Sequence, residues 1–439
     1  MRGDLDRIPG PPPGDGAEAV AAAGGLHHYQ LKLHAEYGPV VRFPLPGADE
    51  AVSVADPVLL EATAGIDKRP EKLFAFLAPL QESGNLQTLP AAEHAPWRKA
   101  MLSVLAGRPS HEAHFARFAE LAVQLADRWE EQGWAETQKD LSELSLRMVC
   151  EYALGSALPP ERSEQVVSAF EDVLTEYLAR LYQVEASDSA SDRAAASLAY
   201  LRRTVDDVLA AHRDAARPDD RSDLVAALVR AGTSPARIRD TVLMTMMAAH
   251  HTTGVAISWT LYLLSRHPDA AERAAAETDA VLGERTVPDY ADLRRLAYLD
   301  RVLKESMRLF PPGPYGARET TEDLTLGGYA IPAGTTLFYP FWAVHMNPEY
   351  WPEPEVFDPD RFTPAASAGR PRLAHLPFGV GPRSCEGAAL ATVEARLVLA
   401  VLLKRFRFAL APGQTIRPIE RFVLWADGDI RMDVAPRAG

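Results

Sequence analysis

The chain has 439 residues, of which 47% are hydrophobic and 24% are charged. This composition is ordinary for a globular protein with a large core, and the length allows one large fold or two to three average domains. A net charge of −14 argues against nucleic-acid binding, because no segment is markedly basic. The only two cysteines, Cys150 and Cys385, lie far apart, so no disulfide framework is expected.

The predicted elements, taken in chain order, favour a mainly α fold with small β-sheets. Residues 1–14 are rich in Pro and Gly and lack an apolar stretch, so we expect neither a signal peptide nor a membrane anchor. Strands are predicted in residues 38–45 and 51–57, whereas residues 70–309 carry almost continuous helical periodicity.

The last third of the chain returns to strand-like patterns. A hairpin with its turn at Gly327 and Gly328 is predicted within residues 323–340, and the final strands within residues 406–410 and 419–437. We find no internal repeat and no break in composition that marks a linker. The sequence therefore predicts one domain over residues 1–439.

Two histidines and two threonines, residues 250–253, interrupt the apolar segment 241–264. Its interrupted character predicts a buried core helix rather than a membrane span. Buried polar side chains are costly unless each finds a partner, so these residues need an explanation. Adjacent helix residues project about 100° apart, whereas metal-binding pairs favour a spacing of three or four residues, so we do not expect His250 and His251 to form a metal site or a functional pair.

The most informative segment is residues 378–387, with the sequence FGVGPRSCEG. It places Cys385 after a glycine-containing loop and before a long apolar helix. A cysteine at a helix N-terminus is expected to have a lowered pKa, which favours the thiolate. The glycines would let the backbone approach a flat ligand, and Arg383 would supply a fixed cation.

This segment matches the haem-binding loop of the cytochrome P450 family at Phe378, Gly379, Gly381, Arg383, Cys385 and Gly387. From about residue 38 to residue 439, the chain resembles a soluble bacterial member of that family. The resemblance implies the cytochrome P450 fold, with haem b bound between the long central helix and the helix after the Cys loop. It also implies that Cys385 is the thiolate ligand of the iron. Cys150 is interpreted instead as a buried structural residue.

Further motifs in the expected order support the resemblance. Glu305 and Arg308 form an ExxR pair on one helix face, and Arg361 in DPDRF corresponds to the third member of the family's buried triad. An ExxR pair alone is unspecific, because surface helices contain many such pairs.

Three residues resemble contacts to the haem propionates. They are His94 and Arg98, spaced four apart in EHAPWRK, and Arg318, which follows the loop after ExxR. The alternative for each is a solvated surface charge.

The resemblance also assigns roles within residues 248–252. Ala248 and Ala249 would leave room for haem and dioxygen, and Thr252 corresponds to the family's proton-relay threonine. Ala249 replaces the usual Gly, and His251 replaces the usual acid. His251 could still pass protons, because histidine titrates near neutrality. The alternative for Thr252 is a packing threonine bonded to the carbonyl four residues earlier. His250 is interpreted as directed away from the haem.

The implied activity is a cytoplasmic monooxygenase that uses O₂ and hydroxylates or epoxidises a lipophilic molecule. A bacterial secondary metabolite of the terpenoid, polyketide or peptide type is the expected substrate class. An apolar pocket is expected, lined by Met244, Met247, Ala248, Pro314, Tyr315, Val423 and Leu424. One alternative is a haem-thiolate enzyme with peroxide-dependent or non-oxygenating (isomerase or coupling) chemistry, and another is a non-catalytic P450-like partner protein.

Electrons are expected from a separate ferredoxin and its ferredoxin reductase. The 54 residues that follow Cys385 are too few for a fused reductase domain. A basic face for the acidic ferredoxin is expected from Arg98, Lys99, Arg372, Lys404 and Arg405.

Overall fold

The computed structural model describes residues 5–12, 16–45, 51–154, 160–181, 188–214, 223–421 and 423–437. Of the predicted N-terminal segment, residues 1–4 and 13–14 therefore lie outside the described residues. The helices of the described part are α2 Gly16–Ala23, α3 Leu26–Tyr37, α4 Pro57–Thr63, α5 Glu71–Phe74, α6 Ala91–Leu105, α7 Arg108–Gln132, α8 Thr137–Leu154, α9 Pro160–Leu181, α10 Asp188–Asp214, α11 Leu224–Arg230, α12 Pro235–Arg266, α13 Pro268–Leu282, α14 Ala297–Leu309, α15 Phe341–His345, α16 Pro364–Ser367 and α17 Ala388–Arg405.

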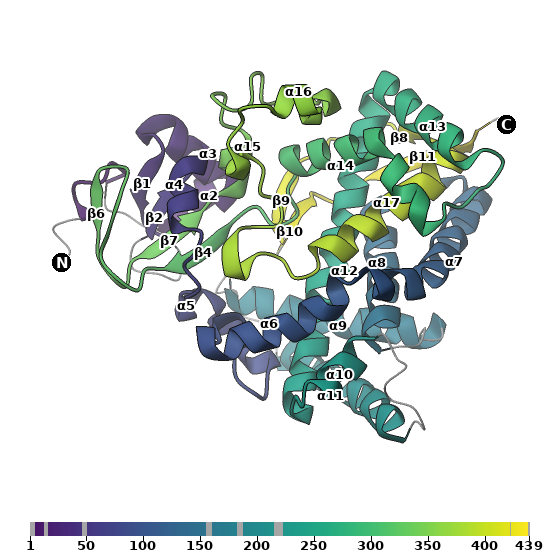
Figure 1. Cartoon of the computed structure of the whole chain (residues 1–439), viewed down its shortest axis with the longest axis horizontal. Coiled ribbons are helices and arrows are strands. Elements are labelled where there is room, and N and C mark those ends of the chain that lie inside the picture. Colours follow the sequence, from purple (N-terminus) through teal and green to yellow (C-terminus); the bar gives the residue numbers. More distant parts are fainter. Residues whose placement is uncertain are drawn as a thin grey trace.

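The strands form small, separate sheets. They are β1 Val40–Phe43, β2 Ala51–Val54, β3 Trp134–Glu136, β4 Gly316–Glu319, β5 Leu324–Leu326, β6 Tyr329–Ile331, β7 Thr336–Tyr339, β8 Phe406–Leu410, β9 Pro418–Arg421, β10 Val423–Ala426 and β11 Arg431–Pro436. One sheet has the order β1-β2-β7-β4, another has the order β3-β11-β8, and β5-β6 and β9-β10 are hairpins. Figure 1 shows the four-stranded sheet on the N-terminal side of the molecule and α7, α8 and α13 on the opposite side.

The predicted pattern of helices and strands agrees with the structure apart from β3 and β4, which were not predicted from the sequence. Gly327 and Gly328 have φ angles of 57° and 86°, as a tight turn between β5 and β6 requires. Strand β3 is only three residues long and lies between two helices, so the helical periodicity on both sides hides it. It forms because it pairs with β11, which lies almost 300 residues later in the chain.

Helix α12 is the long central helix. It begins after Ser234, whose side chain accepts a hydrogen bond from the Arg237 N–H, and Pro235 occupies its first turn. Gly254 allows close packing against α8, because a Cβ atom there would lie 2.6 Å from the backbone of Leu141 and Ser142. In the described part of the chain, no helix combines the length and apolar character that a membrane span needs.

Helices α12 and α17 build the centre of the main hydrophobic core. Residues 397–402 of α17 have no exposed side-chain surface, and α17 packs against α7, α12 and α13. The Cys loop leads directly into α17, and the apolar segment with residues 250–253 forms the middle of α12. The fold therefore brings the two segments that the sequence singles out onto neighbouring helices (Figure 1).

Candidate functional site: the Cys loop and its surroundings

The Cys loop is a tight turn closed by backbone hydrogen bonds. The Cys385 N–H donates to the Phe378 carbonyl at 2.8 Å, and the Gly379 N–H donates to the Leu376 carbonyl at 2.9 Å. Gly379 and Gly381 have φ angles of 72° and 69°, which side chains disfavour. Gly381 does not face a ligand as expected, because a Cβ atom there would lie 1.8 Å from the Ala64 carbonyl oxygen. This glycine instead lets the loop pass the end of α4.

The expectation of a lowered thiol pKa at Cys385 is wrong for the polypeptide alone. Burial is the largest effect and raises the pKa to about 11, and the Glu386 carboxylate raises it further. The N–H groups of Gly387 and Ala388, at the start of α17, lower the pKa, but by less than burial raises it. A bound metal cation would reverse this balance, because coordination deprotonates a thiol. Cys150 is buried as predicted, and burial raises its pKa.

Cys385, which precedes α17, and Ala248 on α12 keep accessible surface at the two central helices of the core. Cys385 is exposed, although desolvation has the largest effect on its pKa. Ala248 is exposed on α12, although Met246, Met247 and His250 beside it are buried. Cys385 thus combines accessible surface with desolvated surroundings, and Ala248 leaves accessible surface among buried neighbours on α12. The small Ala248 side chain on one helix and the Cys385 thiol beside the other are therefore compatible with the haem that the resemblance implies.

Charge in the same region supports this fit. Arg69, Arg98, Arg318 and Arg383 lie close enough to affect one another electrostatically, and Asp67 and Glu386 are the acids that act on them. Among the described residues, four arginines against these two carboxylates leave an excess of two positive charges. Haem b carries two propionates, so the chain offers the compensating charge that a buried haem needs.

The predicted propionate contacts are placed around this cluster. Arg318 is 3% exposed and, within the described part of the chain, donates to the backbone carbonyls of Ala317 and Val380. Arg98 forms an ion pair with Glu386 and donates to the Ser384 carbonyl at 2.7 Å. These two arginines are therefore not solvated surface charges.

His94 and Arg383 are tied together through Asp67, which sequence reasoning missed. His94 Nδ1 lies 3.1 Å and Arg383 Nε 2.6 Å from Asp67 Oδ1. Burial lowers the pKa of His94 to about 4, so His94 is neutral at pH 7. Arg69 was missed as well, and burial lowers its pKa to about 9. Nothing in the spacing of Asp67 and Arg69 marks them, because both contact Arg383, which lies more than 300 residues later in the chain.

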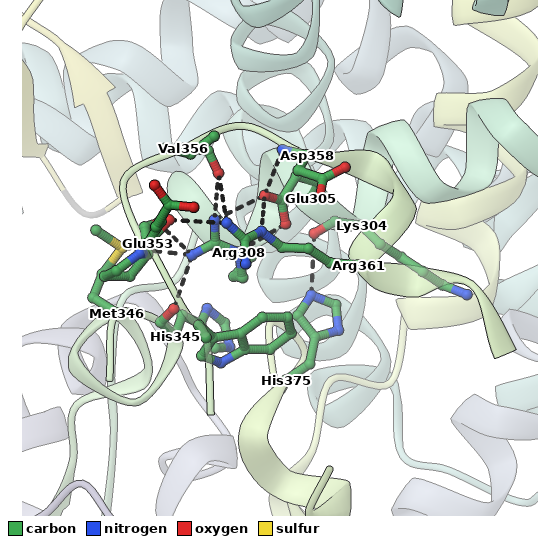
Figure 2. Close-up of polar contacts among 12 residues, drawn as sticks. Lys304, Glu305, Arg308, His345, Met346, Glu353, Val356, Asp358, Arg361 and His375 are labelled. Carbon is green, nitrogen blue, oxygen red and sulfur yellow. Dashed lines mark hydrogen bonds and ion pairs between the residues drawn. The ribbon is translucent and has the colours of Figure 1, made fainter. Parts of the chain in front are cut away.

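The structure brings the three predicted triad residues together in the interior (Figure 2). Arg308 Nε and Nη2 donate to the two carboxylate oxygens of Glu305 at 2.7 and 2.8 Å, and neither side chain has exposed surface. Arg361 Nε lies 3.4 Å from Glu305 Oε1. The remaining donors of Arg308 reach the carbonyls of His345, Pro354 and Val356. The triad thus fixes the chain after α15 onto α14.

Thr252 donates its hydroxyl proton to the Ala248 carbonyl at 2.7 Å, which is the contact of a packing threonine. This bond leaves the lone pairs of Oγ1 able to accept from a ligand. Burial lowers the pKa of His251 to about 4, so the expected titration near neutrality is wrong. His250 is 3% exposed. The rings of His250 and His251 stack at 4.0 Å, although we expected them to diverge, because rotation about their side-chain bonds turns the rings together.

The predicted pocket residues divide into two groups. Tyr315 is 37% exposed and Ala248 is exposed, so both are accessible to a ligand. Met244, Met247 and Pro314 are buried. Val423 and Leu424 are 1% and 0% exposed, so they pack the core rather than line an open pocket. Hydrogen bonds of the Leu424 backbone hold this strand in the core. Its N–H donates to the Pro312 carbonyl, and its carbonyl accepts from the Trp259 indole.

Four of the five residues of the predicted basic face form ion pairs, and Lys99 is exposed. Arg98 pairs with Glu386 and Arg372 with Glu61. Lys404 pairs with Asp279, and Arg405 pairs with Asp127 and Glu130. The free positive charge is therefore smaller than the count of cationic residues indicates.

Comparisons with known proteins agree with this geometry. The sequence model of the family described as Cytochrome P450 matches residues 17–432. Pentalenene oxygenase of Streptomyces avermitilis is 28% identical over 93% of this chain and 93% of its own length. Cyclooctatin synthase of Streptomyces melanosporofaciens is 39% identical over 55% of this chain. Human Cytochrome P450 4F12 is 41% identical over 44% of this chain. The matched regions span 53% and 37% of these last two proteins. The chain belongs to the cytochrome P450 family.

Proposed function

We propose that this protein is a haem-thiolate monooxygenase that hydroxylates or epoxidises a lipophilic, terpenoid-type small molecule in the cytoplasm, with electrons from a ferredoxin system. The observation that carries the proposal is the accessible, desolvated Cys385 next to a buried arginine cluster with two uncompensated positive charges. The names of the two Streptomyces relatives support the substrate class.

Members of this family bind haem b. When bound and ligated by a thiolate, this group supplies the activation of O₂ and the transfer of one oxygen atom to the substrate. Cys385 would hold the iron, and Arg69, Arg98, Arg318 and Arg383 would balance the propionates. Because all four arginines lie in one cluster, they would also fix the orientation of the group.

Thr252 and Ala248 would act on the other side of the bound group. The Thr252 hydroxyl holds a proton at Oγ1 while its lone pairs accept from a ligand or water. His251 is neutral at pH 7, so it would position a neighbour or accept a proton briefly rather than store one. Its ring packs edge-on against Trp425 of β10 at 5.0 Å. This contact favours a positioning role.

Turnover with a reconstituted ferredoxin and ferredoxin reductase tests the proposal. Lipophilic terpenoids are first screened for a spin-state shift, and the binders are then incubated with O₂ and the redox partners. Incorporation of one atom of labelled O₂ into the product is expected. Product formation only with added peroxide, or product without an inserted oxygen atom, would support the alternative haem-thiolate chemistries instead.

A further inference from the structure

His345 connects the Glu305–Arg308–Arg361 triad with the start of the Cys loop. It is the last residue of α15 and has no exposed surface. Its Nε2 atom accepts a hydrogen bond of 2.9 Å from the backbone N–H of Leu376, which is itself 2% exposed. Its carbonyl accepts a bond of 3.0 Å from Arg308 Nη1. Figure 2 shows His345 directly beside Arg308.

Hydrogen bonds continue from Leu376 to the cysteine. The Leu376 carbonyl accepts from the Gly379 N–H at 2.9 Å, and the Phe378 carbonyl accepts from the Cys385 N–H at 2.8 Å. Hydrogen bonds, together with the peptide links between them, therefore connect Arg308 through His345 to the residues that hold Cys385. We propose that His345 is a positioning residue that anchors the Cys loop to the triad through the Leu376 N–H. This inference rests on the proposal that Cys385 binds the haem iron.

The chemistry of the ring agrees with this role. To accept from Leu376, Nε2 must be unprotonated, so the proton is at Nδ1. Burial, His375 and Arg308 lower the pKa of His345, which keeps the ring neutral. Nδ1 makes no well-formed hydrogen bond among the described residues, and the Arg308 backbone, which acts on the ring, raises its pKa. A buried donor without a partner is unfavourable. An apolar side chain would avoid that cost, so packing alone does not account for the imidazole.

Other contacts hold the preceding residues independently. His375 Nε2 lies 3.1 Å from the Lys304 carbonyl, and the Trp351 indole donates to the Ala374 carbonyl at 3.2 Å. Loss of the His345 side chain therefore releases the Leu376 amide without detaching residues 374 and 375. This separation makes a local test feasible.

The test compares His345→Leu with His345→Gln in the full-length, haem-containing protein. Leu removes the acceptor, whereas the Gln carbonyl reaches close to the position of Nε2. His345→Asn is a second loss variant, because its carbonyl is too short to reach Leu376. His111→Leu is the matched control: His111 is 2% exposed and its Nε2 lies 2.9 Å from the Leu105 carbonyl, far from the loop in sequence. The readouts are hydrogen exchange in the peptide that covers residues 374–380 and the share of thiolate-type signal in the carbon monoxide difference spectrum.

His345→Leu and His345→Asn are expected to speed exchange at Leu376 about 10- to 100-fold, the consequence of an unpaired buried amide. They should also lower the share of thiolate-type signal, and His345→Gln should restore both readouts. Wild-type values in the Leu and Asn variants, or a Gln variant that behaves like Leu, would overturn the inference. Absence of a thiolate-type signal from the wild type would refute the role of Cys385 instead, while the exchange comparison would still decide the role of His345.

Discussion

Replacement of Glu305 by Gln tests the energetic role of the buried triad. The change removes one negative charge and keeps the shape, so Arg308, which has no exposed surface, loses its only carboxylate within 4 Å among the described residues. Arg361, with 10% of its side chain exposed, loses the same partner. Breaking a buried pair by neutralising one member costs about 3–5 kcal/mol, because the remaining charge stays buried.

This cost corresponds to a measurable shift in the melting temperature. At roughly 2.1 cal/mol/K per residue, 439 residues give an unfolding entropy of about 0.9 kcal/mol/K, so Glu305→Gln should lower the melting temperature by about 3–5 °C. The matched control is Asp360→Asn, which breaks the exposed pair with Arg273 at 3.0 Å and the weaker pair with Arg301 at 3.7 Å. An exposed pair contributes about 0.2–1 kcal/mol, so the control should shift by about 1 °C or less.

Scanning calorimetry at one fixed scan rate measures both variants. Equal shifts for Glu305→Gln and Asp360→Asn would refute the reasoning, because they would mean that burial adds nothing to the pair.

Three further changes have defined outcomes. Thr252→Ala should lower the product formed per electron pair and leave the carbon monoxide spectrum intact, whereas unchanged coupling would make Thr252 a packing residue. Burial raises the pKa of Glu394 to about 8, so this carboxyl binds more protons in the folded than in the unfolded state between pH 4.5 and 8, and its contribution to stability falls as pH rises through this range. In urea unfolding at pH 5.5 and pH 8, Glu394→Gln should gain stability relative to wild type as pH rises, and a pH-independent difference would contradict the assignment. Buried Asp240 accepts hydrogen bonds from the N–H groups of Glu82 and Ser83, so Asp240→Asn should speed limited proteolysis at these residues, and cleavage at the wild-type rate would argue against this anchor.

Contiguous and helical motifs were the features that the sequence could predict. The Cys loop is a continuous segment that its own spacing identifies, and Glu305 and Arg308, one helical turn apart, are identified by their place before DPDRF and the Cys loop. Asp67, Arg69 and His345 escaped notice because their partners come from distant segments. Sequence spacing carries no information on such contacts.

Protonation states were also beyond sequence reasoning. The helix N-terminus at Cys385 is visible in the sequence, but the desolvation that raises its pKa exists only in the folded chain. The same effect keeps His251 neutral, although an exposed histidine would titrate near pH 6.5. Burial, rather than residue type, decides the charge of both groups.

The carbon monoxide difference spectrum of the reduced protein tests the central claim most directly. The wild type should give a thiolate-type band, and Cys385→Ala should lose it while Cys150→Ala keeps it. Absence of the band from the wild type, or its persistence in Cys385→Ala, would contradict the assignment of Cys385 as the ligand of the haem iron.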